Sequence, residues 1–381
     1  MSIDTVRIGD ICEILNGFAF KSENYVESGI RVIRIANVQK GYIEDSTPVF
    51  YPEDSTGLDK YMLESGDLLM SLTGNVGRVA ILAEEFLPAA LNQRVACLRM
   101  KSDRVSKGYL YHILNSDYFE QKCIQSSKGV AQKNMSTEWL KDYEIPVYTE
   151  EKQAEIVSIF DHLQGIIANR RQELQSLDDI IKARFVEMFG SVKEERLLGD
   201  ISEFVTVGIA NSATHAYAES GIPMLRNQNI KENHLDDSDL IYIKPEFAAQ
   251  YESKKLKEND IIAMRTGYPG IACLVPKKYE GCQTFTTLIV RLKAGNNPRY
   301  VCSYINSDLG KRYIDSGKVG VAQQNFGAKS LAKMPIKIAP KEMQNEYAEF
   351  VAQVDKSKSV IQKSLDETQL LFDSLMQEYF G

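Results

Sequence analysis

The stretch Thr149-Glu-Glu-Lys-Gln-Ala-Glu-Ile-Val, which continues to Phe185-Val-Glu-Met-Phe-Gly190, predicts one long helix. It contains no proline, and its only internal glycine is Gly165. Its apolar side chains recur in alternating steps of four and three, the spacing of a helix that buries a narrow seam against another helix. At about 1.5 Å per residue, such a helix would be on the order of 60 Å long.

A second stretch, from Pro340 to Gly381, has the same pattern, and its proline suits the first turn of a helix. Charged or polar residues interrupt both seams, so the heptads are imperfect. Each seam is too long and narrow for a small domain to cover, so we expect the two helices to pack on each other. An antiparallel pair would give a pseudo-twofold arrangement, and a parallel pair is the alternative. The residues expected at this interface are Ile156, Phe160, Leu163, Ile167, Leu174, Leu177, Ile181, Val351, Val354, Ile361, Leu365 and Phe372.

The rest of the chain also reads twice, with an offset of about 190 residues. Such an ordered series of matches indicates an internal duplication. We therefore predict an α+β fold with two similar α/β domains at 1–148 and 191–339, each followed by a long helix, at 149–190 and 340–381. A shorter helix is expected at 106–125, with its counterpart at 299–316. Among the matching motifs are Ile8-Gly9-Asp10-Ile11 with Leu198-Gly199-Asp200-Ile201, and Thr73-Gly74-Asn75-Val76-Gly77 with Thr266-Gly267-Tyr268-Pro269-Gly270.

The charge distribution argues against a generally basic nucleic-acid binder. The net charge is −7, and the two helical stretches carry −3 and −4, which leaves the remainder neutral. No run of 18 apolar residues and no apolar signal segment at the start are found, so we expect a cytoplasmic protein without a membrane span. The six scattered cysteines are interpreted as reduced thiols, and the four distant histidines as surface or half-buried residues rather than metal ligands.

Catalytic motifs are missing from the sequence. It contains no GxxxxGK[ST] phosphate loop, no GxSxG or HExxH motif, and no Asn-Pro-Pro-aromatic tetrapeptide of amino-methylating enzymes. We therefore predict no catalytic residues and no metal site.

Each half instead contains three polar loops rich in amide and basic side chains, the types that read base edges and hold phosphates. The alternative is purely structural: the glycine-rich loops can be hairpin turns, and the loops before the long helices can be simple connections. The residues predicted to contact DNA are Arg34, Asn37, Lys40, Thr73, Asn75, Arg78, Gln93, Arg94, Lys128, Gln132, Lys133 and Asn134 in the first half, and Arg226, Gln228, Asn229, Lys231, Arg265, Thr266, Tyr268, Thr284, Lys318, Gln323, Gln324 and Asn325 in the second.

Taken together in this order, the motifs resemble the specificity (S) subunit of type I restriction–modification systems. The resemblance covers both halves: the opening motif, the TGNVG and TGYPG turns, the GVAQKN and GVAQQN loops, the Ile145-Pro146 and Met334-Pro335 exits, and a long helix after each. It implies two target recognition domains that each read one half of a gapped, double-stranded DNA target.

The resemblance also implies partners and cofactors. The antiparallel helices would set the spacing of the half-sites and help to dock two methyltransferase (M) subunits, which restriction (R) subunits can join. S-adenosylmethionine, ATP and Mg would be used in those partners, and this chain would hold no cofactor. The competing hypothesis is a non-catalytic coiled-coil scaffold that presents two protein-binding domains and shows no preference for any DNA sequence.

Overall fold

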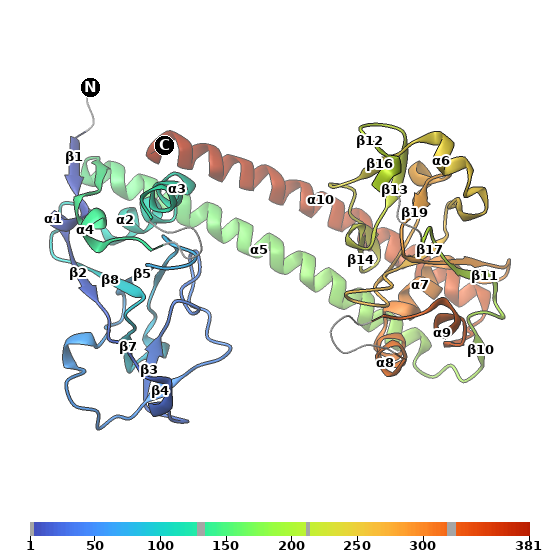
Figure 1. The fold of residues 1–381 in the computed structure, drawn as a ribbon, viewed down its shortest axis with the longest axis horizontal. Helices are drawn as coiled ribbons and strands as arrows, with labels where there is room; N and C mark the ends of the chain where they lie inside the picture. The colour runs from blue at the N-terminus through green and yellow to red at the C-terminus, as the bar shows by residue number, and fades with distance from the viewer. Residues whose placement is uncertain (1–3, 128–133, 211–213, 318–324) are drawn as a thin grey trace. The chain divides into compact units, whose positions relative to one another are not determined.

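A computed structural model of the chain describes residues 4–127, 134–210, 214–317 and 325–381 (Figure 1). The chain forms two compact units: unit 1 comprises residues 1–171 and 362–381, and unit 2 comprises residues 172–361. Each unit therefore contains one globular part together with one end of each long helix. The division into domains at 1–148 and 191–339 and helices at 149–190 and 340–381 stays a prediction.

Unit 1 is built around a four-stranded antiparallel sheet in the order β2-β8-β5-β6. A three-stranded sheet, β4-β3-β7, and the pair β1-β9 complete it. The strands are β1 (Asp4–Arg7), β2 (Cys12–Asn16), β3 (Ile30–Ile33), β4 (Phe50–Tyr51), β5 (Leu68–Ser71), β6 (Val79–Ile81), β7 (Ala89–Leu91), β8 (Val95–Met100) and β9 (Glu144–Val147), and the helices are α1 (Ile8–Ile11), α2 (Lys107–Leu114), α3 (Asp117–Ser126) and α4 (Thr137–Asp142).

The central sheet of unit 1 is buried on both faces. Leu68 and Met70 belong to a core shared with α2, α3 and the long helices, whereas Leu69 and Cys97 belong to a second core on the opposite face. Because side chains alternate along a strand, a strand buried on both faces reads as a continuous apolar run. This explains the segment Leu68-Leu69-Met70, which is apolar throughout.

Unit 2 repeats this plan. Its central sheet has the order β11-β20-β17-β18, which corresponds strand by strand to that of unit 1, and a second sheet has the order β12-β16-β13-β19. The duplication predicted from the sequence is therefore confirmed by the topology. The strands are β10 (Glu195–Leu197), β11 (Ser202–Val207), β12 (Tyr217–Ala218), β13 (Ile222–Leu225), β14 (Ile230–Lys231), β15 (His234–Leu235), β16 (Ile241–Ile243), β17 (Ile261–Ala263), β18 (Ala272–Leu274), β19 (Gln283–Thr284), β20 (Leu288–Leu292) and β21 (Pro335–Lys337), and the helices are α6 (Pro245–Ala249), α7 (Pro298–Asn306), α8 (Asp308–Ser316) and α9 (Ala328–Ala332).

The single helices predicted at 106–125 and 299–316 are each two helices, so this part of the prediction was wrong. In unit 1 the break lies at Ser116, whose hydroxyl accepts a hydrogen bond from the backbone N–H of Phe119 at 3.1 Å. Ser307 does the same for Gly310 in unit 2, at 3.4 Å. A serine that caps a helix in this way has extended rather than helical backbone, and it therefore ends one helix and starts the next.

The two long helices are present as α5 (Glu150–Phe189) and α10 (Lys341–Phe380), each of 40 residues. Within unit 1, Lys152 lies over the ring of Tyr379 and Phe160 contacts Phe372. As residue numbers rise along α5, those of the contacting residues on α10 fall. The same order holds within unit 2, where Lys358 forms an ion pair with Asp178 at 2.6 Å and Arg184 pairs with Glu346 at 2.8 Å. The helices therefore run antiparallel.

The predicted seam lies on the packed side of both helices, but the buried stripe is wider than predicted at their ends. Phe185, Phe189, Met376 and Phe380 are also buried, and they pack into the globular cores of their own units. An end that faces a partner helix and a domain at once buries a broader face than a coiled-coil seam does. Of the predicted seam residues, Ile156, Phe160, Leu163, Ile167, Ile181, Val351 and Val354 are buried, and Leu174, Leu177, Ile361, Leu365 and Phe372 are half-buried.

A buried glutamine fastens the start of each long helix to its globular part. The side-chain amide of Gln153 donates to the carbonyl oxygens of Arg104 and Tyr148, both at 3.0 Å, and its oxygen accepts from the N–H of Ser106 at 2.9 Å. In unit 2, Gln344 accepts from the N–H of Asn297 and donates to the carbonyl of Ala339, both at 2.8 Å. These backbone groups would lack partners without the amide.

Replacing Gln153 with alanine is expected to lower the free energy of unfolding of unit 1 by about 2–3 kcal/mol, because buried backbone groups lose their hydrogen bonds. Chemical denaturation followed by circular dichroism measures this loss. Gln175→Ala is the matched control, since Gln175 is an exposed glutamine of the same helix. Equal stabilities of the two variants would contradict the proposed role of the buried amide.

His112 on α2 is fully buried, and its Nε2 lies 2.9 Å from Oδ1 of Asp161 on α5. Burial lowers the pKa of His112, and the hydrogen bond to Asp161 only partly opposes this effect. The unfolded chain thus binds a proton near pH 6.5 that the folded chain binds only at lower pH. Unit 1 should therefore lose stability as the pH falls below about 6.5.

We expect the pH dependence to be reduced in His112→Asn, which has no titratable group at this position. The free energy of unfolding is measured by denaturation at several values between pH 7.5 and 5.5. As the pH falls, that of the wild-type protein should decrease by up to about 1.4 kcal/mol per pH unit more than that of the variant. Parallel curves for the two proteins would show that the buried histidine does not contribute.

Candidate nucleic-acid interface

In unit 1, two of the predicted polar loops and the turn that carries Arg94 meet around one cavity of about 290 Å³. The loop after β3 contributes Gln39, the turn between β5 and β6 contributes Thr73, Asn75 and Arg78, and the turn before β8 contributes Arg94. These segments are far apart in the chain, and the two central sheets bring their ends together. The predicted candidates Thr73, Asn75, Arg78 and Arg94 therefore form one site.

Arg78 is held from two sides by neutral amides. Its Nη1 donates to Oε1 of Gln39. With the amide of Asn75 turned so that its oxygen faces the arginine, this oxygen accepts from Nη2 at 3.1 Å and from Nη1 at 3.3 Å. These contacts orient the guanidinium but do not neutralise its charge. Gln39 lies in one of the predicted polar loops but is not among the predicted DNA contacts.

The turn that carries Arg78 is a tight β5–β6 hairpin, as the structural alternative proposed. The N–H of Ser71 donates to the carbonyl of Arg78 at 3.0 Å, and that of Gly77 donates to the carbonyl of Ser71 at 2.9 Å. Gly77 has a φ of +83°, and a Cβ there would lie 2.8 Å from Cβ of Cys123 on α3. A larger residue would therefore push the turn away from α3. The hairpin is thus both a structural turn and a support for polar side chains.

The equivalent hairpin of unit 2 has the same backbone contacts but different side chains. Met264 donates to the carbonyl of Ile271 at 2.8 Å, as Ser71 does to Arg78, so Ile271 occupies the position of Arg78. Thr266 accepts a hydrogen bond from Nδ2 of Asn227 at 2.9 Å. The neighbouring Tyr268 is 76% exposed, and Arg265 is half-buried. The two units therefore present different chemical groups on one scaffold.

Three residues predicted as DNA contacts are buried, and for them the prediction was wrong. Asn37 and Asn229 hold their own loops: their amides donate to the carbonyls of Glu44 at 2.7 Å and Asp236 at 3.0 Å. Thr284 lies on β19, pairs with Leu225 of β13, and is fully buried. A side chain enclosed by its own domain cannot reach a base. Repetition of Asn37 and Asn229 in both halves reflects this structural role.

Several predicted cations are already paired with acidic groups. Lys40 contacts Asp117 at 2.5 Å and Glu120 at 2.9 Å. Arg226 pairs with Asp239 at 2.9 Å, and Lys231 lies 3.7 Å from Asp236. A carboxylate at this distance cancels much of the attraction that a phosphate would feel. Two further candidates have local partners as well: Arg34 donates to the carbonyl of Thr47, and Gln228 donates to Asp239.

The remaining candidates are Gln93 and the residues predicted in the loops that precede α4 and α9. Asn134 forms a β-bridge with Thr73, and Asn325 forms the corresponding bridge with Thr266, so one end of each loop adjoins the hairpin of its own unit. Gln93 is exposed next to Arg94. Six predicted contacts lie outside the described residues: Lys128, Gln132, Lys133, Lys318, Gln323 and Gln324.

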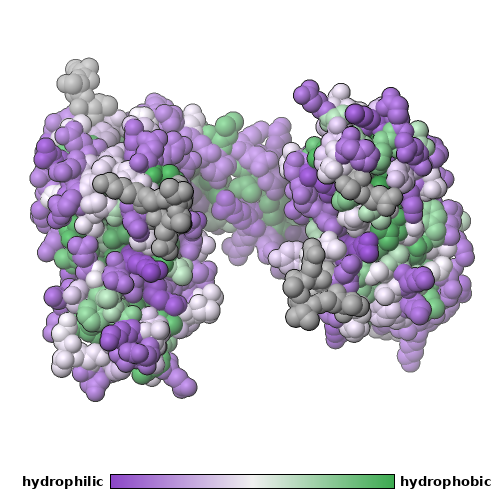
Figure 2. Space-filling view, viewed as in Figure 1, coloured by the Kyte–Doolittle hydropathy of each residue, from purple (hydrophilic) through white to green (hydrophobic). Residues whose placement is uncertain are grey.

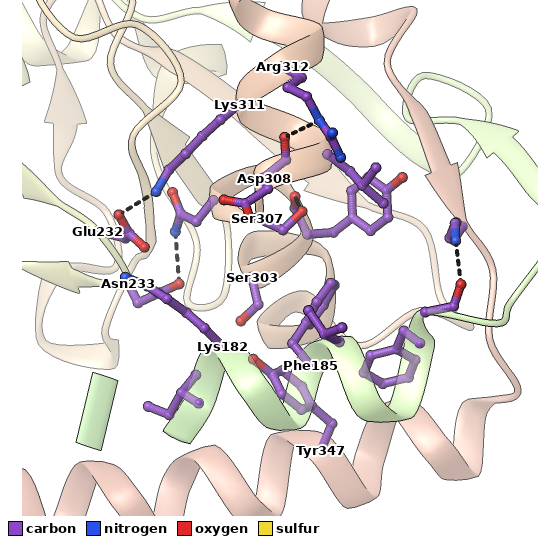
Figure 3. A pocket seen from close by; sticks show the side chains of 18 residues that line it. Lys182, Phe185, Glu232, Asn233, Ser303, Ser307, Asp308, Lys311, Arg312 and Tyr347 are labelled. Atoms are coloured by element: carbon purple, nitrogen blue, oxygen red, sulfur yellow. Dashed lines mark hydrogen bonds and ion pairs between the residues drawn. The ribbon is translucent and has the colours of Figure 1, made fainter. Parts of the chain in front are cut away.

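A larger cavity of about 360 Å³ lies in unit 2 between α5 and the α7–α8 pair (Figure 3). Phe185 and Tyr347 form part of its apolar wall. At its rim, Lys311 forms an ion pair with Glu232 at 2.9 Å. Asn306 donates to Oδ1 of Asn233 at 2.8 Å. The cavity thus has an apolar wall and a polar rim, and at this rim the charge of Lys311 is paired with that of Glu232.

The rim pair of this cavity has a counterpart of opposite polarity in unit 1. There the lysine is on the loop, as Lys40, and the acid is on the helix, as Glu120. In unit 2 the acid, Glu232, is on the loop and Lys311 is on the helix. Each pair links the segment that follows β3 or β13 to α3 or α8. Exposed pairs of this kind contribute at most about 1 kcal/mol, so they adjust the loops rather than hold the fold.

Burial keeps the cysteine side chains protonated. All six cysteines are free thiols and buried, and burial raises the pKa of Cys12 and Cys282 to about 12. Such thiols are poor nucleophiles at neutral pH. In the part of the chain that the structure describes, no group of three His, Cys, Asp or Glu residues could hold a metal ion.

The surface visible in Figure 2 is mainly hydrophilic on each unit, with scattered hydrophobic residues. Among the described helices, none is long and apolar enough to cross a membrane.

Comparison with known proteins assigns this sequence to a family. Residues 2–178 and 191–368 each match the family described as "Type I restriction modification DNA specificity domain". The chain is 22% identical to the type I restriction enzyme EcoBI specificity subunit of Escherichia coli over 411 residues, which cover 98% of this chain and 83% of that protein. It is 29% identical to the type I restriction enzyme MjaVIII specificity subunit of Methanocaldococcus jannaschii over 182 residues, which cover 46% of this chain and 42% of that protein.

Two solved structures have a similar fold. The S subunit of a type I restriction-modification system from M. genitalium aligns over 100% of this chain and 96% of its own, with a TM-score of 0.58 and 13% identity. A chain from a study of complex assembly and conformational transition of the type I R-M system aligns over 99% and 97%, with a TM-score of 0.60 and 14% identity. The two family matches cover nearly the whole sequence, and the chain therefore belongs to the type I restriction modification DNA specificity family.

Proposed function

We propose that this chain is the DNA-recognition subunit of a type I restriction–modification complex and that each globular part reads one half of a gapped target. The observation that supports this best is the pair of equivalent hairpins. Their backbone contacts are the same in both units, yet Arg78 and Asn75 in one correspond to Ile271 and Tyr268 in the other. One scaffold with different exposed side chains suits two modules that read different half-sites.

In this proposal the chemistry resides in partner subunits. Two methyltransferase subunits would use S-adenosylmethionine, and restriction subunits, where present, would use ATP and Mg. The chain itself would supply position and sequence preference. The antiparallel helices α5 and α10 would fix the length of the unread spacer and provide part of the surface on which the methyltransferase subunits dock.

The charge of the chain gives this proposal a measurable consequence. Outside the long helical stretches the sequence is neutral, so attraction to phosphates is modest. We expect weak DNA binding by the chain alone and tight, salt-sensitive binding by the complex with methyltransferase subunits. Gel-shift titrations at several salt concentrations test this, and equal affinity with and without the partner would contradict it.

Methylome sequencing of cells with and without the protein tests the function itself. Loss of one gapped, methylated motif on deletion is the expected result. Exchanging residues 1–148 for the corresponding segment of another specificity subunit should then change one half of the motif and leave the other half and the spacer intact. A methylome that does not respond to deletion would favour a scaffold that binds proteins only.

A further inference from the structure

Resting on the proposed function, we infer that Arg78 reads a guanine in the half-site recognised by unit 1, and that the half-site recognised by unit 2 is read without an equivalent arginine. Arg78 and Arg94 line the cavity of unit 1 described above. Among the described residues, neither forms an ion pair with a carboxylate, whereas Arg99 and Arg31 of the same unit do. The cavity therefore carries two cations whose charge the protein leaves available.

The two arginines differ in how firmly they are held. The guanidinium of Arg78 is oriented by Gln39 and Asn75, which come from two different loops. Arg94 is exposed, and its described hydrogen bonds involve only its backbone: the N–H donates to Oδ1 of Asn92 at 3.2 Å, and the carbonyl accepts from the N–H of Leu72 at 2.9 Å. A fork fixed in one orientation suits bidentate recognition, because little conformational freedom is lost when it binds. An unrestrained cation suits a phosphate, for which position matters less.

The ligand that matches a fixed guanidinium fork in DNA is the edge of guanine. In the major groove, guanine presents two neighbouring acceptors, O6 and N7, and bidentate contact with arginine is the commonest specific pairing. A guanidinium has five N–H donors, so the amide oxygens of Gln39 and Asn75 leave donors free for a base. Thr73 and the small residues Ala36 and Gly74 line the same cavity and leave space for that edge.

Unit 2 lacks both cations at the equivalent positions. Ile271 stands where Arg78 does, as the backbone hydrogen bonds of the two hairpins show. The β3–β7 and β13–β19 pairings align Leu91 with Thr284, and the pairings of β8 and β20 align Ala96 with Leu288. The segment between these positions is therefore one residue shorter in unit 2, and its residues, Phe285, Thr286 and Thr287, include no cation. The contact proposed for Arg78 thus belongs to one half-site. Substitution of Arg78 should leave the other half of the target unchanged.

The test uses the full-length chain in complex with its methyltransferase subunits and a pool of duplex DNA with randomised sequence. Sequencing of the bound fraction gives the base preference at every position. The wild-type complex is expected to prefer guanine at one position of one half-site by roughly tenfold to hundredfold. Arg78→Lys retains the charge but not the fork, and it should reduce that preference toward equal use of the four bases.

Three further variants separate the roles. Gln39→Leu keeps both cations and should weaken the same guanine preference, because Arg78 loses an orienting partner. Arg94→Ala should lower affinity for all sequences alike and reduce the salt dependence without changing the motif. Arg7→Ala is the control: Arg7 is an exposed arginine of the same unit on β1, and its loss should change neither. Thermal denaturation of each variant checks that it is folded.

The outcomes distinguish this inference from the proposed function. If Arg78→Lys keeps the guanine, or if Arg78→Ala weakens binding evenly as Arg94→Ala does, Arg78 is a phosphate contact and the inference is wrong, while the gapped motif of the wild type still supports the proposed function. If the wild-type complex selects no motif at all, the proposed function itself fails and the inference fails with it.

Discussion

Replacement of Asp260 with alanine is expected to destabilise unit 2 by about 3–5 kcal/mol, because it leaves a largely buried guanidinium without its counter-ion. Asp260 is 2% exposed and accepts two hydrogen bonds from Arg291, from Nε at 2.8 Å and from Nη2 at 2.6 Å. It also accepts from the N–H of Lys257 at 2.8 Å. Arg291 lies over the ring of Phe204 as well, so it cannot easily turn toward water.

Equilibrium denaturation in urea measures the loss, and Glu219→Ala, which removes an exposed carboxylate of the same unit, is the control. The same arrangement exists in unit 1, where Arg99 donates to Asp67 at 3.0 and 2.6 Å. Arg99 also forms an ion pair with Glu64 at 3.0 Å, so a counter-ion remains in Asp67→Ala and its effect on that unit should be smaller. A cost below about 1 kcal/mol for both variants would mean that the arginines find other partners or solvent.

Truncation of Phe160 to alanine should lower the free energy of unfolding of unit 1 by about 3–5 kcal/mol, the range for removing a fully buried phenylalanine side chain. Phe160 lies where α2, α5 and α10 meet. Its ring centroid is 5.3 Å from those of His112 and Phe372 and 5.6 Å from that of Phe380. No single neighbouring element can move to fill the space, so most of the cavity should remain.

Hydrogen exchange would show which elements lose local stability. We expect faster exchange in the last turns of α10 and in α2 of the Phe160→Ala protein. Val360→Ala, an exposed substitution on α10, should change neither stability nor exchange by a measurable amount. In the assembled complex, a charged residue at position 160 should broaden the range of spacer lengths before it alters base preference. Changed bases with an unchanged spacer would contradict the proposed division of roles.

The sequence predicted the larger architecture because its signals are local and repeated. A seam with alternating steps of four and three specifies a long helix wherever it occurs, and two copies in one chain supply a partner for it. Contacts such as those of Phe160 with Phe372 and of Arg184 with Glu346 then confirmed the antiparallel order. The duplication was equally visible, since an ordered series of matches does not depend on any one contact.

The sequence was less informative about which polar residues face outward. Asn37 and Asn229 lie in loops whose amide and basic residues are typical of base-reading loops. Both are nevertheless buried, and they hold their own turns. Thr284 lies in the counterpart of the Asn92-Gln93-Arg94 segment and was predicted for that reason, but strand pairing places it opposite Leu225 inside the domain. Amide and hydroxyl groups serve backbone carbonyls as readily as bases, so residue type alone does not distinguish the two roles.

The sequence by itself therefore determined the two long helices, their pairing, the duplicated α/β plan and the family. Only the tertiary structure decided that the helix ends belong to the globular cores, that Ser116 and Ser307 divide the shorter helices, and that Gln39 and Asn75 orient Arg78. The physical reason is the range of the interactions. Helix periodicity depends on residues that are close in the sequence. Burial and the contacts between loops depend on strand order and register, which bring distant segments together.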